Sequence, residues 1–153
     1  MIFCLSIMAY AQTPQDRATE LKKQAQSSLN QKDYIKARYL FKKAYEAFAS
    51  RENYPQAIEC GVQANALYVR ENFYKEGFEL CRDMEQLLWT GEQNKKKVFY
   101  DLRFLINKER LQMYTALKNP AQAKIQLDKL EEMANLAKND SLTEVLLYTK
   151  ANY

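Results

Sequence analysis

Apolar and small residues recur at spacings of three and four along most of the chain. In one stretch the recurring positions are Ala37, Leu40, Phe41, Ala44 and Phe48. This spacing places them on one side of a helix. Short polar breaks separate such stretches. The pattern predicts seven helices, over residues 14–30, 34–50, 55–70, 74–90, 97–118, 120–138 and 141–153.

Residues suited to helix starts stand at several of the breaks. Thr13-Pro14 opens the first helix, because threonine caps well and proline fits the first helical position. Asn119-Pro120 ends the fifth helix and begins the sixth. Ser141 and Glu144 have the spacing of a capping box and are expected to begin the last helix.

The composition supports an all-helical protein and excludes several kinds of site. The chain has no histidine and only three glycines, which excludes histidine-based triads, histidine zinc sites and glycine-rich phosphate loops. So few glycines and prolines also disfavour a turn-rich β fold. A net charge of +4 gives no strong preference for nucleic acid. We therefore predict an all-α protein that is not an enzyme and uses no cofactor and no metal ion.

The first eleven residues differ from the rest of the chain. Ile2–Met8 is almost wholly apolar, and Ala9-Tyr10-Ala11 has the small-x-small pattern of a cleavage site. We predict that residues 1–11 are a secretory signal peptide, truncated or atypical because no basic residue follows Met1. The alternative is a frayed apolar segment. Residues 12–153 then form the helical domain.

Similar residues follow three of the breaks. In the clearest case Asp33-Tyr34 precedes Ala37, Phe41 and Ala44, and related units begin at Phe73-Tyr74 and Asn119-Pro120. This unit resembles the tetratricopeptide repeat, in which pairs of antiparallel helices stack into a right-handed superhelix, an α-solenoid. The resemblance gives pairs at about 14–50, 55–90 and 97–138, with a fourth starting at 141. It implies packing between helices for Ala25, Tyr34, Ala37, Phe41, Ala44, Tyr68, Gly77, Cys81, Leu111, Tyr114, Ala123, Leu127 and Leu130.

A tetratricopeptide array also implies a groove lined by the first helix of each pair, where extended peptides or partner helices bind. Carried over by position, the groove residues are Lys22, Gln26, Leu29, Asn30, Val62, Gln63, Ala66, Arg70, Lys108, Glu109, Gln112 and Thr115. The pairs Lys22 with Gln26 and Lys108 with Gln112 are similar to the clamp with which some co-chaperones of the family hold a C-terminal carboxylate. Leu105 and Glu109 depart from that clamp. A protein or peptide ligand of unspecified sequence is therefore expected.

Two further features have both a structural and a functional interpretation. The run Lys95–Lys97 could meet phosphate or an anionic lipid surface, but a solvated helix start is the expected case, with no nucleic-acid partner. Cys60 and Cys81 could form a disulfide in an oxidising compartment. The expected case is two small buried side chains.

These features together predict an exported interaction module. An export signal before such repeats resembles the extracytoplasmic sensor region of membrane-anchored bacterial signalling proteins. That resemblance implies a periplasmic or extracytoplasmic location, a kinase-like or transcriptional output domain, and a membrane segment outside this chain. The apolar residues Val145 and Leu146 of the last helix would have no partner from a completed helix pair. We therefore expect this chain to be the N-terminal part of a larger protein. The alternatives are a free-standing periplasmic adaptor or assembly factor, and a ligand-binding or enzymatic pocket of tyrosines and carboxylates.

Overall fold

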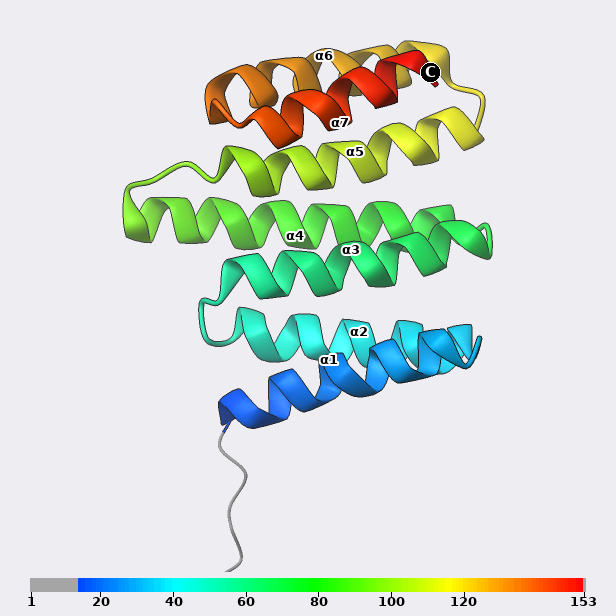
Figure 1. Cartoon of the computed structure of the whole chain (residues 1–153), viewed down its shortest axis with the longest axis vertical. Coiled ribbons are helices and arrows are strands. Elements are labelled where there is room, and N and C mark those ends of the chain that lie inside the picture. The colour runs from blue at the N-terminus through cyan, green and yellow to red at the C-terminus, as the bar shows by residue number, and fades with distance from the viewer. Residues whose placement is uncertain (1–13, 153) are drawn as a thin grey trace, which may run out of the picture.

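The computed structural model of the chain describes residues 14–152, and this range is all-α. It contains seven helices and no β-strand (Figure 1). In chain order they are α1 (Pro14–Asn30), α2 (Tyr34–Ala49), α3 (Tyr54–Arg70), α4 (Tyr74–Lys95), α5 (Tyr100–Ala116), α6 (Pro120–Ala137) and α7 (Asp140–Ala151). The predicted fold class is therefore confirmed. Thr13 and the predicted signal peptide lie outside the described residues.

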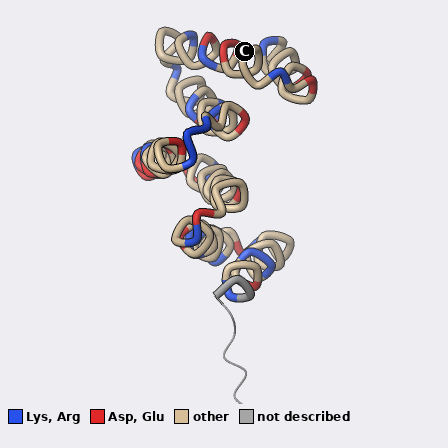
Figure 2. Tube along the Cα trace, turned by 90° about the vertical axis from the view of Figure 1, so that its left-hand side faces the viewer, with Lys and Arg blue, Asp and Glu red and all other residues tan. Residues whose placement is uncertain are grey.

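Successive helices run antiparallel and stack in chain order (Figure 1). Each helix packs on the next one, and α3 also packs on α5. A view turned by 90° shows the helices nearly end-on, in a zigzag rather than a flat sheet of helices (Figure 2). The arrangement is solenoid-like, and its right-handed winding stays a prediction.

The turns between helices depend on a residue in the left-handed backbone region. Among the described residues, six non-glycine residues have positive φ, all in or next to the connections between helices: Lys32, Glu52, Asn72, Lys96, Lys118 and Lys138. A cap often follows within one residue. The side chains of Asp33, Asn53 and Asn119 each accept a hydrogen bond from a backbone N–H of the next helix. This accounts for the short polar breaks in the sequence.

The apolar stripes meet in two clusters of buried side chains. The larger cluster joins α1–α4 to Leu102, Ile106 and Met113 of α5, and the smaller joins α5, α6 and α7. Of the thirteen residues predicted to pack between helices, ten are buried. The other three, Tyr34, Tyr68 and Tyr114, are half-buried. Gly61 shows how close the helices come, because a Cβ there would lie 2.5 Å from the Met84 sulfur. Small residues thus allow α3 and α4 to approach each other.

The helix boundaries differ from the sequence prediction most clearly at the end of α4, at the start of α7 and at the start of α5, which begins at Tyr100 instead of residue 97. Helix α4 continues to Lys95 instead of ending near residue 90, because Gly91 packs against the Tyr54 ring and Glu92 is buried. Helix α7 is capped by Asn139, whose Oδ1 accepts the Ser141 N–H at 3.0 Å. The predicted capping box at Ser141 was therefore wrong. The helix starts at Asp140, one residue earlier.

Candidate partner-binding surface

The odd-numbered helices share one side of the stack. In Figure 1, α1, α3 and α7 lie in front of α2, α4 and α6. A polar contact joins α1 to α3, α3 packs on α5, and two pockets bridge α1 with α3 and α5 with α7. We call the surface residues contributed by these helices the odd-helix face. They are Lys22, Lys23, Gln26, Gln63, Ala66, Lys108, Gln112 and Tyr148.

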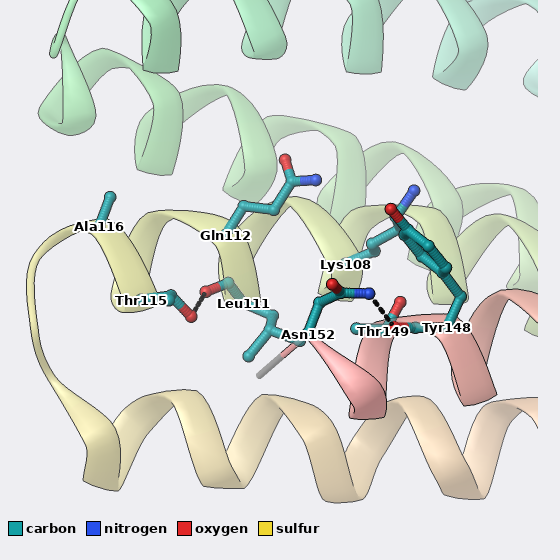
Figure 3. A pocket seen from close by; sticks show the side chains of 8 residues that line it. All are labelled: Lys108, Leu111, Gln112, Thr115, Ala116, Tyr148, Thr149 and Asn152. Carbon is teal, nitrogen blue, oxygen red and sulfur yellow. Dashed lines mark hydrogen bonds between the residues drawn. The ribbon is translucent and has the colours of Figure 1, made fainter.

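The pocket between α5 and α7 is the more apolar of the two. Its volume is about 430 Å³. The lining residues are Lys108, Leu111, Gln112, Thr115, Ala116, Tyr148, Thr149 and Asn152 (Figure 3). Aliphatic groups and the Tyr148 ring provide the apolar part, and Lys108 provides the charge. The pocket exists because α7 packs on α6 and leaves a gap beside α5.

Some polar groups of this α5/α7 pocket are already used by its own helices. The Thr115 hydroxyl donates to the Leu111 carbonyl at 2.8 Å, and the Thr149 hydroxyl donates to its own helix at 2.7 Å. Asn152 Nδ2 donates to the Tyr148 carbonyl at 2.7 Å. Within residues 14–152, no hydrogen bond or ion pair is made by the side chains of Lys108, Gln112 or Tyr148. The polar ends of these three point to the same side of the pocket in Figure 3, where a ligand can reach them.

The second pocket lies between α1 and α3. It has a volume of about 490 Å³ and is lined by Thr19, Lys22, Lys23, Gln26, Phe48 and Gln56. Lys22 is held across the two helices, with Nζ 2.9 Å from Gln56 Oε1 and 2.7 Å from Glu59 Oε1. Gln26 donates to Asn30 at 3.1 Å. The clamp-like pair Lys22 and Gln26 is therefore engaged within the protein.

The remaining predicted groove residues are spread over α1 and α3. Gln63 and Ala66 are exposed, whereas Leu29 and Val62 are half-buried. Arg70 is exposed and stacks on the Tyr34 ring, with its guanidinium carbon 4.0 Å from the ring centroid. Most predicted groove residues therefore reach the surface, but Arg70 already has an aromatic partner.

Glu109 does not line the groove, which corrects the sequence interpretation. Its side chain is 5% exposed, and one carboxylate oxygen accepts Asn65 Nδ2 at 2.9 Å. Burial raises the pKa of this carboxyl group, and the Asn65 hydrogen bond opposes that shift. Asn65 is fully buried, and its Oδ1 has no hydrogen-bond partner. The resemblance to the tetratricopeptide repeat predicted that Glu109 points outward, whereas the close packing of α3 on α5 turns it inward.

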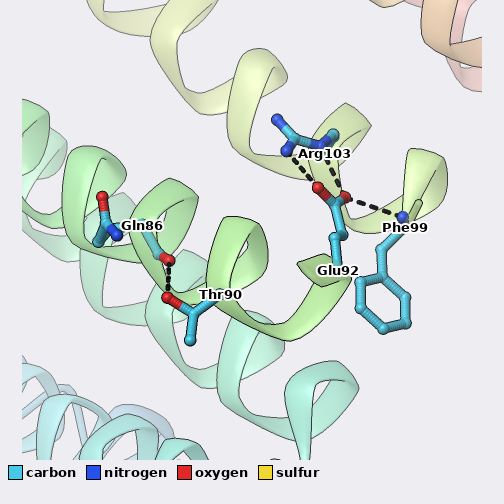
Figure 4. Close-up of polar contacts among 5 residues, drawn as sticks. All are labelled: Gln86, Thr90, Glu92, Phe99 and Arg103. Carbon is cyan, nitrogen blue, oxygen red and sulfur yellow. Dashed lines mark hydrogen bonds and ion pairs between the residues drawn. The ribbon is translucent and has the colours of Figure 1, made fainter. Parts of the chain in front are cut away.

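A partly buried ion pair fixes the connection between α4 and α5 (Figure 4). Glu92 Oε1 accepts the Phe99 N–H at 3.0 Å and Arg103 Nε at 2.8 Å, and Glu92 Oε2 lies 2.5 Å from Arg103 Nη2. The hydrogen bond from Arg103 is the main cause that lowers the pKa of Glu92. Lys95 ends α4 and Lys96 adopts the left-handed conformation. The basic run therefore belongs partly to α4 and partly to the connection, where Figure 2 shows it in blue.

The two central cysteines are buried free thiols. Burial raises the pKa of each thiol to about 12. The charges that act on Cys60 belong to Lys22 and Glu59, whereas Arg110 is the main charged neighbour of Cys81. Both thiols are therefore unreactive in this arrangement.

Metal sites and membrane spans were sought within residues 14–152. No group of three or more cysteine, aspartate or glutamate side chains there is arranged to hold a metal ion. None of the helices in this range is both long and apolar enough to cross a bilayer. Comparison of the chain with protein-family models, with curated proteins and with solved structures found no match.

Proposed function

We propose that the chain is an interaction module that binds an extended segment of a partner protein on the odd-helix face. The pocket between α5 and α7 carries this proposal, because it combines an apolar recess with side-chain groups that have no partner in the described structure. The pocket accepts one apolar side chain of the partner segment. An acidic residue next to that side chain pairs with Lys108.

Charge on the odd-helix face supports an acidic ligand. Lys22 and Glu59 neutralise each other across α1 and α3. Lys23 and Lys108 make no ion pair with any described residue. Lys23 lines the α1/α3 pocket and Lys108 the α5/α7 pocket, so each pocket offers one cation. A partner with acidic residues at both ends of its bound segment matches this arrangement.

We further propose that this recognition takes place outside the cytoplasm of a bacterium, as the sensor or scaffold part of a membrane-anchored signalling protein. The apolar N-terminal segment with its small-x-small site supports export. The alternative is an adaptor that assembles envelope complexes. Both versions use the same odd-helix face, and they differ in what the bound partner controls.

A display library of random peptides tests the binding proposal directly. Peptides selected on the wild-type chain are expected to share an apolar residue beside Asp or Glu. Their affinity, measured by fluorescence anisotropy, is expected to fall about tenfold or more in Lys108→Glu. Ala116→Trp fills the pocket and is expected to weaken the same peptides.

Lys129→Glu is the matched control, because it makes the same charge change on the exposed side of α6, away from the pocket. It is expected to leave affinity within about twofold. Selection without any acidic or apolar consensus, or equal losses in Lys108→Glu and Lys129→Glu, would contradict the proposed site.

A further inference from the structure

The outward side of α2 carries an unusual combination of residues. The exposed residues of this helix are Ile35, Lys36, Tyr39, Lys42, Lys43 and Glu46. Ile35 is 68% exposed and Tyr39 is 61% exposed. These two lie one helical turn apart, opposite the buried side of the helix. Three lysines surround them, against one glutamate.

Most of the positive charge on this surface is unpaired. Lys36 and Lys42 form no ion pair with the described residues. Lys43 pairs with Glu46 at 2.9 Å and lies 5.9 Å from the centroid of the Tyr39 ring. Lys32 and Asp33, in the turn before α2, are also exposed.

A further cation approaches from the neighbouring helix. Glu46 raises the pKa of Lys43 through a hydrogen bond and its charge, and the positive charge of Arg17 on α1 opposes this. Arg17 is itself exposed, on the helix that packs against α2. The basic area extends beyond α2 itself.

The other two even-numbered helices do not share this feature. Helix α4 exposes three basic and three acidic residues, and α6 exposes two basic and three acidic residues. Each of those helices therefore presents a mixed surface, as is usual for a solvated helix. Only on α2, among these three helices, do neighbouring exposed apolar side chains coincide with an excess of cations. Solvation alone does not account for this difference.

We propose that the outward side of α2 docks on an anionic lipid surface. The lysine ammonium groups meet lipid phosphates, while Ile35 and Tyr39 enter the boundary between headgroups and acyl chains. This adds a membrane contact within the chain to the one expected from a segment outside it.

Two properties favour lipid over an acidic protein. All three cations on the exposed side of α2 are lysines, which act as flexible point charges and lack the planar fork with which arginine holds a carboxylate. The surface is the convex outer side of a helix, and a fluid layer of headgroups adapts to such a shape. The residues involved are separate from the odd-helix face, so the two proposals are independent.

Cosedimentation of the full chain with vesicles tests the inference. We compare vesicles of phosphatidylcholine alone with vesicles in which about one third of the lipid is phosphatidylglycerol. The chain is expected to bind the anionic vesicles more strongly, and added salt is expected to weaken this binding. Lys36→Glu/Lys42→Glu is expected to lower the partition coefficient about tenfold or more. Ile35→Ser/Tyr39→Ser is expected to lower it by a smaller factor.

Lys75→Glu/Lys129→Glu is the matched control, because it makes the same charge change at exposed positions of α4 and α6. All variants keep the same N-terminal segment, so its own affinity for lipid cancels in the comparison. Circular dichroism checks that each variant folds. Equal losses in the two double charge variants would overturn the inference, as would equal binding to neutral and anionic vesicles. Binding to polyglutamate instead of vesicles, with the same dependence on Lys36 and Lys42, would assign the surface to an acidic protein.

Discussion

The interior of the stack and its C-terminal end are built very differently. Helix α3 lies between neighbours and buries eight residues, among them Tyr54, Ile58 and Leu67. Helix α7 lies at the end of the described stack and buries only Leu146. Its neighbouring residues Leu147 and Tyr148 are among the exposed large apolar side chains. The interior helices thus supply most of the stability, while the loosely held α7 leaves room for the pocket against α5.

The largest effect that tests this comparison comes from truncating one core side chain in each region. Phe41 is buried in the larger cluster and Leu146 in the smaller one. Phe41→Ala is expected to lower the free energy of unfolding by about 3–5 kcal/mol. Leu146→Ala is expected to cost about 2 kcal/mol, at the low end of the range for a buried leucine, since α7 packs against α6 over a small contact. Thermal unfolding measures both losses.

Hydrogen exchange shows which helices each substitution destabilises. In Leu146→Ala the amides of α7 are expected to lose protection while those of α2 and α3 keep it. In Phe41→Ala the amides of α1–α4 are expected to lose protection together. Equal protection losses throughout the stack in both variants would show that the two regions unfold as one unit and would break the comparison.

A smaller effect is expected at the buried contact between α3 and α5, where the two regions meet. The pKa of folded Glu109 lies above its ordinary value of 4.5, so its contribution to stability is complete below that pH and is lost as pH rises through the folded pKa. In Glu109→Gln the amide keeps the bond from Asn65 and offers a donor to Asn65 Oδ1. The melting temperature of Glu109→Gln minus that of the wild type is therefore expected to increase from pH 4 to pH 7. A difference that stays constant with pH would show that Glu109 is not the titrating group.

The smallest effect concerns the turns. Lys118, between α5 and α6, has a φ of 53°, and Asn72, between α3 and α4, has a φ of 62°. Lys118→Gly is expected to stabilise the protein by about 0.5 kcal/mol, because glycine adopts this conformation without steric cost. Asn72→Gly is expected to bring no gain, since asparagine tolerates the conformation and Asn72 Oδ1 accepts the Tyr74 hydroxyl at 2.8 Å. Chemical denaturation measures both, and a gain in Asn72→Gly would contradict this account.

Most of the fold could be predicted from the sequence, because apolar periodicity and polar breaks are local features. The exception at the end of α4 has a physical reason. The predicted helices left residues 91–96 as a polar connection, but Glu92 is buried and is bonded to Arg103, which lies eleven residues later. The sequence around residue 92 does not show this contact, because the partner lies eleven residues away across a turn whose geometry the sequence does not specify.

The candidate site was less predictable. Lys108 and Gln112 were placed on the surface by their position in the repeat, and the same reasoning placed Glu109 there incorrectly. Which side of α5 is covered depends on how closely α3 approaches it. The contact of Glu109 with Asn65 can be recognised only once the positions of both helices are known. The pocket could not be predicted at all, since it depends on where Tyr148 lies relative to α5.

The Glu92–Arg103 pair has a mechanical consequence for recognition. It ties the end of α4 to the start of α5 at a point between the α1/α3 pocket and the α5/α7 pocket. Bending the stack there changes the spacing of the two pockets, and bending that separates α4 from α5 requires breaking a bidentate contact. In the proposed binding mode, the pair would therefore hold the spacing of the two pockets and, with it, the length of the segment that can occupy both.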